Sequence, residues 1–271
     1  MAKRFAVFAS TLAVAGLVGC SGQAEPQKVA HTATTAVTPD PAKVTRAALD
    51  RASSAAIKIG SAELRGHIVR EGKQRIDIDE SNIWAGHGPV AVAGTMDATK
   101  AVGAAASLVD QDGKLPRRQV DGVTYYQVDK PLPGPYVGKT WFKDDLEPNR
   151  ENSAGGHDVR DMLREMTELT EVKVVGKESV SSLSATHYRG LLPLDAALSA
   201  ELDSAGVPGT PAAMTVDVWI DDQDLPVKMT QAVERYALSL EFTQFGKVKP
   251  IVAPPASQTV SLTEYSQGSL G

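Results

Sequence analysis

Cys20 is the residue of this sequence whose reactivity is clearest, because its thiol is the one soft nucleophile of the amino-terminal segment. It is the only cysteine among 271 residues, so it has no partner for an intrachain disulfide. A single thiol also falls short of the ligand set of a thiolate zinc site. What remains for Cys20 is reaction of its sulfur with another molecule.

The residues before Cys20 have the order of regions that is typical of a signal peptide. Lys3 and Arg4 supply positive charge, Phe5 to Val18 is an almost unbroken apolar run, and small residues precede the cysteine. The run is shorter than the roughly 20 residues that a helix needs to cross a hydrocarbon core. The sequence therefore predicts a signal peptide at residues 1–19, removed by cleavage before Cys20.

Leu17-Val18-Gly19-Cys20 resembles the bacterial lipobox at every position. The resemblance implies a diacylglyceryl thioether on Cys20, and often a further acyl chain on the new amino terminus. Two or three acyl chains anchor a protein stably, whereas one chain holds only marginally. We expect the mature protein on the extracytoplasmic face of the cell membrane, with membrane lipid as the partner of Cys20. The alternatives are an ordinary cleaved signal with a chance cysteine, and an uncleaved anchor.

Residues 20–41 predict a disordered tether, because they are rich in Ala, Thr, Pro, Ser and Gln and show no hydrophobic periodicity. A coil of this length spans roughly 25 Å on average. The folded part would therefore stay close to the membrane without being embedded in it.

The five histidines do not have the spacing of a metal site or of a catalytic centre. His31 falls in the tether, His67 on an expected strand and His87 in a Gly-rich loop. His157 precedes an expected helix, where a cap or surface role is the better interpretation, and His187 alternates with Tyr188 on a strand. We expect no site role for any of them.

Other catalytic and ligand-binding motifs are missing from the sequence. It contains no Gly-x-Ser-x-Gly nucleophile elbow and no phosphate-binding loop. Asp221-Asp222-Gln223-Asp224 suggests calcium at first sight, but it lacks the glycine and distal glutamate of the helix-loop-helix site, so we expect a turn. Asp77, Asp79 and Asp144-Asp145 fit solvated faces. The sequence thus predicts neither an enzyme nor a bound cofactor or metal.

The charge pattern excludes a nucleic-acid-binding protein. The formal charge is −5, and acidic and basic residues are interspersed instead of forming a basic stripe. No second apolar run approaches membrane-spanning length. We expect a single domain at residues 42–262, stabilised by its core alone, followed by a polar tail at 263–271.

Hydrophobic periodicity predicts an α+β fold built on one large antiparallel sheet. Strands are expected around an Asp-Gly hairpin turn at 121–122 and around the turn at 222–226. The three Trp residues, 84, 141 and 219, are expected to be buried. The expected elements are helices at 41–57, 157–170 and 193–204, a hairpin over 61–79, and strands at 119–128, 139–143, 171–180, 184–191, 213–221, 226–235 and 237–246.

Short motifs along residues 41–262 resemble the actinobacterial LppX/LprAFG lipoproteins, a family akin to the outer-membrane lipoprotein carriers. The motifs are Val120-Asp121-Gly122-Val123-Thr124-Tyr125-Tyr126 with Gly138-Lys139-Thr140-Trp141, Thr186-His187-Tyr188-Arg189-Gly190, Val218-Trp219-Ile220-Asp221, Leu225-Pro226, Phe245-Gly246-Lys247 and Ala253-Pro254-Pro255. The resemblance implies a strongly curved sheet, or half-barrel, with helices across its concave face and an apolar cavity for acyl chains between them.

Two functions follow as expectations. In the first, the lipoprotein binds a lipid or acylated molecule in the apolar cavity and acts as a carrier or chaperone. In the second, it is a protein-binding sensor or regulatory module of the cell envelope without lipid cargo. The small residues of the helix at 41–57 favour the first, because alanine side chains fill little of the space between helix and sheet. A dry core would produce the same apolar pattern.

Overall fold

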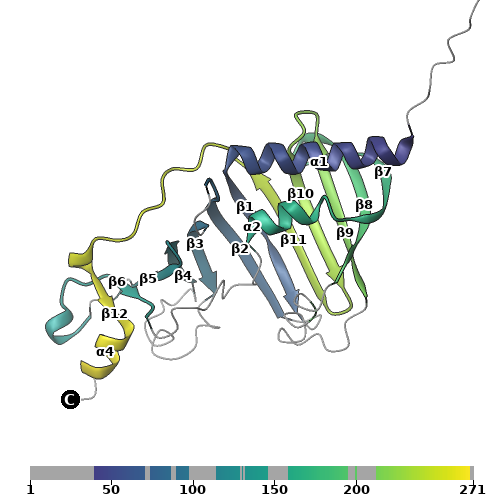
Figure 1. Cartoon of the computed structure of the whole chain (residues 1–271). Helices are drawn as coiled ribbons and strands as arrows, with labels where there is room; N and C mark the ends of the chain where they lie inside the picture. Colours follow the sequence, from purple (N-terminus) through teal and green to yellow (C-terminus); the bar gives the residue numbers. More distant parts are fainter. Residues whose placement is uncertain are drawn as a thin grey trace, which may run out of the picture. The chain divides into compact units, whose positions relative to one another are not determined.

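An open sheet of twelve strands forms the body of the described part of the protein (Figure 1). The computed structural model describes residues 40–70, 74–86, 90–97, 114–128, 130, 132–145, 158–194, 199 and 212–268. The strand order is β12-β6-β5-β4-β3-β2-β1-β11-β10-β9-β8-β7. Neighbouring strands are antiparallel except β12 and β6, which pair in parallel at one end. The predicted α+β class with a large, mainly antiparallel sheet is confirmed.

The elements follow one another along the chain mostly as hairpins. The helices are α1 (Pro41–Ile59), α2 (Val159–Glu165) and α4 (Leu262–Gly268), with 3-10 turns η3 (Gly134–Tyr136) and η4 (Ala256–Gln258). The strands are β1 (Ser61–Arg70), β2 (Gln74–Ile83), β3 (Ala91–Asp97), β4 (Lys114–Val120), β5 (Val123–Gln127), β6 (Trp141–Lys143), β7 (Thr170–Val180), β8 (Leu183–Pro193), β9 (Ala213–Asp221), β10 (Pro226–Val233), β11 (Tyr236–Thr243) and β12 (Thr259–Ser261).

Helix α1 begins and ends where its sequence signals lie. The Asp40 side chain accepts a hydrogen bond from the backbone N–H of Ala42, and proline occupies the first turn, where its missing N–H costs nothing. Gly60 ends the helix in the left-handed conformation, with φ of 81°, and its N–H donates to the carbonyl of Ala56. The predicted helix is confirmed, and it continues to Ile59.

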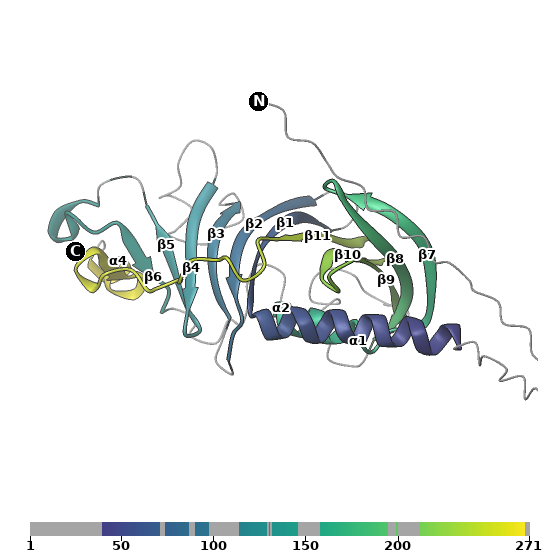
Figure 2. The same ribbon diagram turned by 90° about the horizontal axis from the view of Figure 1, so that it is seen from above.

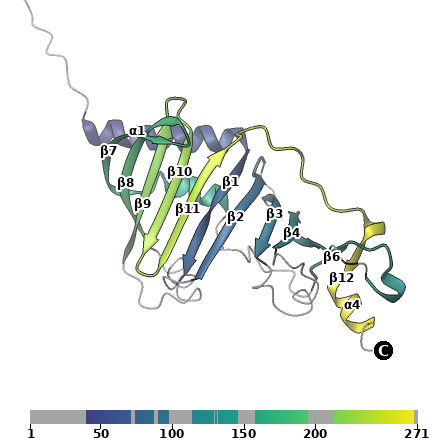
Figure 3. The same cartoon turned by 180° about the vertical axis from the view of Figure 1, so that it is seen from behind.

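Seven strands, β1, β2 and β7–β11, together with α1 and α2, form the part that we call the half-barrel. Seen from above, β1 and β7–β11 curve around a concave side, and both helices lie along that side (Figure 2). From behind, the opposite face of the strands is in view, with α1 behind them (Figure 3). The main apolar cluster lies between helices and sheet and includes Leu49, Leu163, Val218 and Leu240.

Strands β3–β6 and β12, together with α4, continue the sheet beyond β2, and we call them the outer strands. Their smaller apolar cluster contains Leu132, Phe142 and Val260. Helix α4 includes residues that the sequence predicts to be a polar tail. Its Tyr265 packs against Phe142, with ring centroids 5.0 Å apart, so this helix is part of the folded domain.

One predicted helix differs from the structure, and another is mostly untested. The helix expected at 157–170 ends at Glu165, and the chain enters β7 at Thr170. The N–H groups of Thr167 and Glu168 donate instead to carbonyls three residues earlier, those of Arg164 and Glu165. The guanidinium of Arg46 donates to the carbonyls of Thr167 and Leu169. Local hydrophobic periodicity cannot predict these hydrogen bonds, because Arg46 of α1 is far in the sequence from the carbonyls that it contacts. The helix expected at 193–204 lies mostly outside the described residues, and Pro193 itself ends strand β8.

The predicted hairpins are present. The Asp121-Gly122 turn joins β4 and β5 with φ of 53° and 76°, the positive values that a tight hairpin turn requires. Strands β1 and β2 pair over their whole length, and β9, β10 and β11 form the predicted meander.

Candidate functional site

The inner face of α1 is built from small side chains. Ala48, Ala52 and Ala56 are buried against the sheet, and Leu49 is the large residue among them. Trp84 fills space at the end of this helix, and its Nε1 donates to the carbonyl oxygen of Ala56 at 3.2 Å. Small residues on the helix leave the volume between α1 and the sheet to be filled by long side chains of α2 and the strands.

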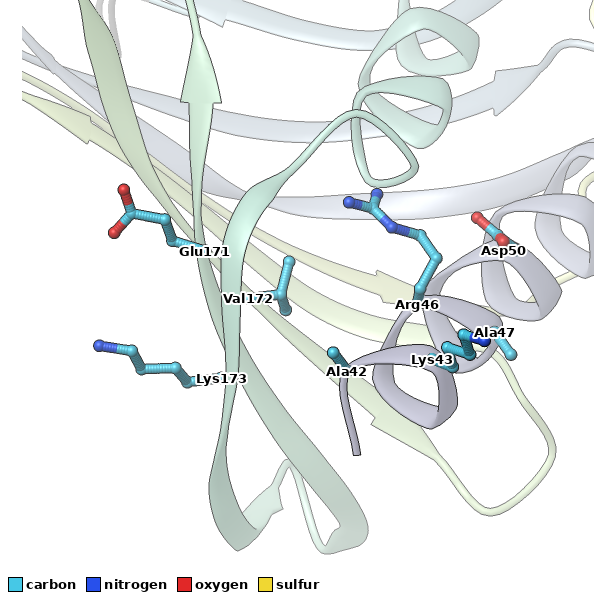
Figure 4. A pocket seen from close by; sticks show the side chains of 8 residues that line it. All are labelled: Ala42, Lys43, Arg46, Ala47, Asp50, Glu171, Val172 and Lys173. Carbon is cyan, nitrogen blue, oxygen red and sulfur yellow. The ribbon is translucent and has the colours of Figure 1, made fainter. Parts of the chain in front are cut away.

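An open groove of about 710 Å³ lies between the first turns of α1 and the first residues of β7 (Figure 4). Ala42 and Ala47 line it from the helix, and Val172 points toward the helix from the strand. Val172 also packs against the main apolar cluster. The apolar lining of the groove therefore continues into the core of the half-barrel.

Charged side chains surround this apolar lining. Lys43, Arg46 and Asp50 come from α1, whereas Glu171 and Lys173 point away from the helix on the other side (Figure 4). Arg46 is half-buried and is held by the two main-chain carbonyls described above, so it ties α1 to the start of β7. The lining of the groove thus combines three apolar residues with five charged ones, and we call the charged residues its rim.

His187 lies on the convex face, away from the groove, in a network that the sequence does not reveal. Its Nδ1 is 2.8 Å from Glu178 Oε1 and its Nε2 is 2.6 Å from Asp217 Oδ1. The ring stacks on Trp219 with centroids 4.1 Å apart. Hydrogen bonds from Trp219, which contributes most, and from His187 lower the pKa of Glu178 below its usual range. The alternation of Thr186-His187-Tyr188 predicts a strand, but it cannot show which residues of β7 and β9 lie alongside.

The other residues singled out from the sequence occupy structural positions. Trp84, Trp141 and Trp219 are buried, as predicted. The Asp221–Asp224 segment is the predicted turn: Asp221 Oδ1 accepts from the backbone N–H groups of Gln223 and Leu225, and Asp224 pairs with Arg51 of α1 at 3.0 Å. His67 lies on β1. Cys20, His31, His87 and His157 lie outside the described residues.

The sequence predicts Asp144 and Asp145 on a solvated face, but the carboxylate of Asp145 has a clear structural role. Asp145 accepts hydrogen bonds from Ser261 Oγ and from the backbone N–H and hydroxyl of Thr263, which brings β12 and α4 to β6. Burial acts to raise the pKa of Asp145, but these hydrogen bonds outweigh it and the pKa is lowered.

Metal-binding groups and membrane-spanning helices are both absent from the described ranges. There, His, Cys, Asp and Glu side chains form no group suited to holding a metal ion. None of the described helices combines the length and apolarity needed to cross a membrane.

Comparison with solved structures identifies the fold. The crystal structure of LprF from Mycobacterium bovis superimposes with a TM-score of 0.53 and 11% sequence identity, over 80% of this chain and 100% of that chain. The protein has an LprF-type lipoprotein fold. The lipoprotein LppX of Mycobacterium tuberculosis aligns with a TM-score of 0.48 and 14% identity, over 79% of this chain and 100% of its own.

Comparison with curated protein sequences found a further similar protein. An uncharacterized 31.2 kDa protein from the rplA-rplJ intergenic region of Streptomyces griseus is 28% identical in an alignment of 181 residues, and the match covers 56% of this chain. The matched region spans 58% of the length of that relative. No family model matches the sequence. The LprF-type fold places α1 and α2 on the concave side of a curved sheet, as the sequence resemblance implied.

Proposed function

We propose that the protein is a lipoprotein, anchored through Cys20 to the extracytoplasmic face of the membrane, that binds a lipid or acylated molecule at the half-barrel and passes it on as a carrier or chaperone. The observation that carries this proposal is the groove between α1 and β7, because its lining continues into the main apolar cluster. Its volume of about 710 Å³ is in the range usual for small-molecule sites.

The groove also lies next to the segment that would join the domain to the membrane. Ala42, Lys43 and Arg46 line the groove, and Pro41 directly precedes them at the start of α1. Even fully extended, the chain from Cys20 to Pro41 spans at most about 75 Å. A lipid leaving the bilayer would therefore meet the groove within a short distance of the anchor.

The proposed activity is binding and release. Capture and delivery of a lipid are equilibrium steps, so the proposal requires no nucleophile, metal or cofactor. Apolar contact area would supply the affinity, at about 25 cal/mol per Å² of surface removed from water. The charged rim would stay hydrated and would contact the polar part of the ligand.

Filling the groove tests the proposal. We suggest a soluble Cys20→Ala protein, delipidated, with uptake of a fluorescent fatty acid as the measurement. Ala47→Trp should weaken binding at least tenfold, because the indole occupies groove volume. Ser54→Trp is the matched control, since Ser54 is also exposed on α1 but does not line the groove. Equal binding by both variants would exclude the groove as the site.

The anchor is tested separately by incorporation of radiolabelled palmitate in cells. We expect labelling of the wild-type protein and none of Cys20→Ala; unchanged labelling would contradict lipidation at this residue. A soluble Cys20→Ala protein that takes up no lipid, yet captures a defined membrane protein, would support the alternative function as a protein-binding regulatory module.

A further inference from the structure

Strand β7 forms one wall of the groove, and β8 is its only neighbour among the described strands. Residues 171–173 of β7 line the groove. The register between β7 and β8 shifts between Thr170 and Lys173 and again between Val174 and Gly176. Shifts of this kind interrupt the backbone ladder and bend the strand. The segment that forms the groove wall is therefore the part of β7 whose backbone pairing is least regular.

Side chains fix β7 on both sides of this irregular segment. Just before the strand, Arg46 of α1 holds two main-chain carbonyls. Beyond the second register shift, Glu178 Oε2 accepts from Trp219 Nε1 at 2.8 Å, and Glu178 Oε1 lies 2.8 Å from Nδ1 of His187. Because Trp219 belongs to β9, this carboxylate connects the edge strand across β8 to the next strand of the sheet.

His187 of β8 lies between two carboxylates. Its second ring nitrogen, Nε2, is 2.6 Å from Oδ1 of Asp217 on β9. His187 is only 4% exposed, so water can replace neither contact. We call Glu178, His187 and Asp217 the histidine clamp, because they link β7, β8 and β9 through consecutive polar contacts.

Both ring nitrogens of His187 must donate a hydrogen bond. Asp217 is ionised, because its Oδ1 also accepts from the guanidinium of Arg189 at 2.7 Å. Glu178 is ionised as well, because hydrogen bonds from Trp219 and His187 lower its pKa. An ionised carboxylate only accepts hydrogen bonds, and a neutral imidazole has a single N–H. A neutral ring would direct a lone pair at one carboxylate, so the geometry requires the doubly protonated imidazolium.

The other charged groups near the clamp are two cations, and neither contacts the ring nitrogens. The guanidinium of Arg189 pairs with Asp217 from the surface, where its side chain is 57% exposed. Lys228 of β10 lies over the indole of Trp219, 4.8 Å from the ring centroid, whereas His187 stacks on that indole from β8. The carboxylates at hydrogen-bond distance are therefore the nearest charges to the ring, and they favour its cationic form.

We propose that the histidine clamp is a pH-sensitive device that holds the wall of the groove in place. While His187 is doubly protonated, β7 is fixed and the groove retains its ligand. When the ring loses a proton, one of the two contacts becomes repulsive, the wall loosens and the ligand leaves. Because the stabilising form is a cation, the effect is present at lower pH and is lost as the pH rises. The inference rests on the proposed function and adds its regulation.

The clamp itself is tested without ligand. Nitrogen NMR of the imidazole, assigned by comparison with His187→Gln, should show both nitrogens of His187 protonated at pH 7 and one proton lost toward about pH 9. Hydrogen exchange, measured relative to the unfolded chain, should show about tenfold lower protection of β7 in His187→Gln at pH 7. Wild-type protection should fall to the same level as the ring loses its proton, and this titration does not depend on the variant.

Release of a fluorescent fatty acid from the soluble Cys20→Ala protein is the second measurement. His187→Gln should release the fatty acid about tenfold faster at pH 7, and the protein with His187 should reach that rate at alkaline pH. The variant also reports any pH dependence of the fatty acid itself. Lys177→Gln is the matched control on β7, because Lys177 pairs with Asp222 in an exposed ion pair at 3.6 Å. It should change neither exchange nor release.

The possible results separate this inference from the proposed function. A single ring proton on His187 at pH 7, or wild-type protection of β7 in His187→Gln, would overturn the clamp. Unchanged release of the fatty acid from a protein with a loosened β7 would overturn its control of the groove. If the protein with an intact clamp takes up no fatty acid, the proposed function fails, whereas NMR and hydrogen exchange still decide whether the clamp holds β7.

Discussion

The half-barrel and the outer strands belong to one sheet, yet their cores are built differently. The half-barrel buries long aliphatic side chains beneath a helix whose inner face consists mostly of small residues. The outer strands bury a small apolar cluster against which tyrosines pack. The ring centroids of Tyr136 and Tyr265 are 5.3 Å apart. Between the two clusters, Glu80 of β2 and Arg117 of β4 form a mostly buried ion pair. Apolar area between helix and sheet is thus concentrated in the half-barrel, where an exchangeable ligand would find contacts.

Because the half-barrel contains the larger apolar cluster, we expect a substitution that disrupts its packing to destabilise the whole domain. Gly66 of β1 faces β11, and a Cβ there would lie 1.8 Å from the carbonyl oxygen of Ser239. Gly66→Ala must push these strands apart, and we expect a loss of about 3 kcal/mol or more in the free energy of unfolding. Urea denaturation measures it. Ser54→Ala on the exposed face of α1 should stay within about 0.5 kcal/mol of wild type.

The corresponding change in the outer strands should be smaller and local. A Cβ on Gly94 of β3 would lie 2.5 Å from its nearest neighbour, the carbonyl oxygen of Asp79, so Gly94→Ala is less severe than Gly66→Ala. We expect about 2 kcal/mol of destabilisation, with separation of Glu80 from Arg117. Native-state hydrogen exchange should show loss of protection in β3 and β4 while β8–β11 stay protected. A uniform loss over all strands would contradict the division into two regions.

The same two regions differ in how far the sequence predicts them. In the half-barrel, the alternation of Val216, Val218 and Ile220 and the caps at Asp40 and Gly60 are local signals, so the strands and α1 follow directly. In the outer strands, local pattern does not predict α4, because Leu262 and Tyr265 acquire a partner only when Phe142 is brought to them from far along the chain.

The candidate sites are predictable only in part. The small residues at 41–57 predict a helix that covers the sheet loosely, and the groove lies along its first turns. Its other wall, at Val172, follows from the position of β7 at the sheet edge, which depends on strand order and not on local pattern. The histidine clamp likewise depends on the strand pairing that brings together Glu178, His187 and Asp217, three residues from three strands.

The mildest prediction concerns acid and the attachment of α4 to the outer strands. The lowered pKa of Asp145 means that its carboxylate stabilises the folded state above its ordinary pKa of 3.8, and that this contribution is lost as the pH falls through the lower folded value. Asp145→Asn should therefore cost about 1 kcal/mol at pH 7, through weaker hydrogen bonds from Ser261 and Thr263, and less near pH 2. Urea unfolding at both pH values measures the difference, and Asp144→Asn is the neighbouring control.

Because α4 covers only the smaller cluster, hydrogen exchange in β8–β11 should not change in Asp145→Asn. If it does, the outer strands and the half-barrel unfold as one unit, and the two cores are energetically coupled.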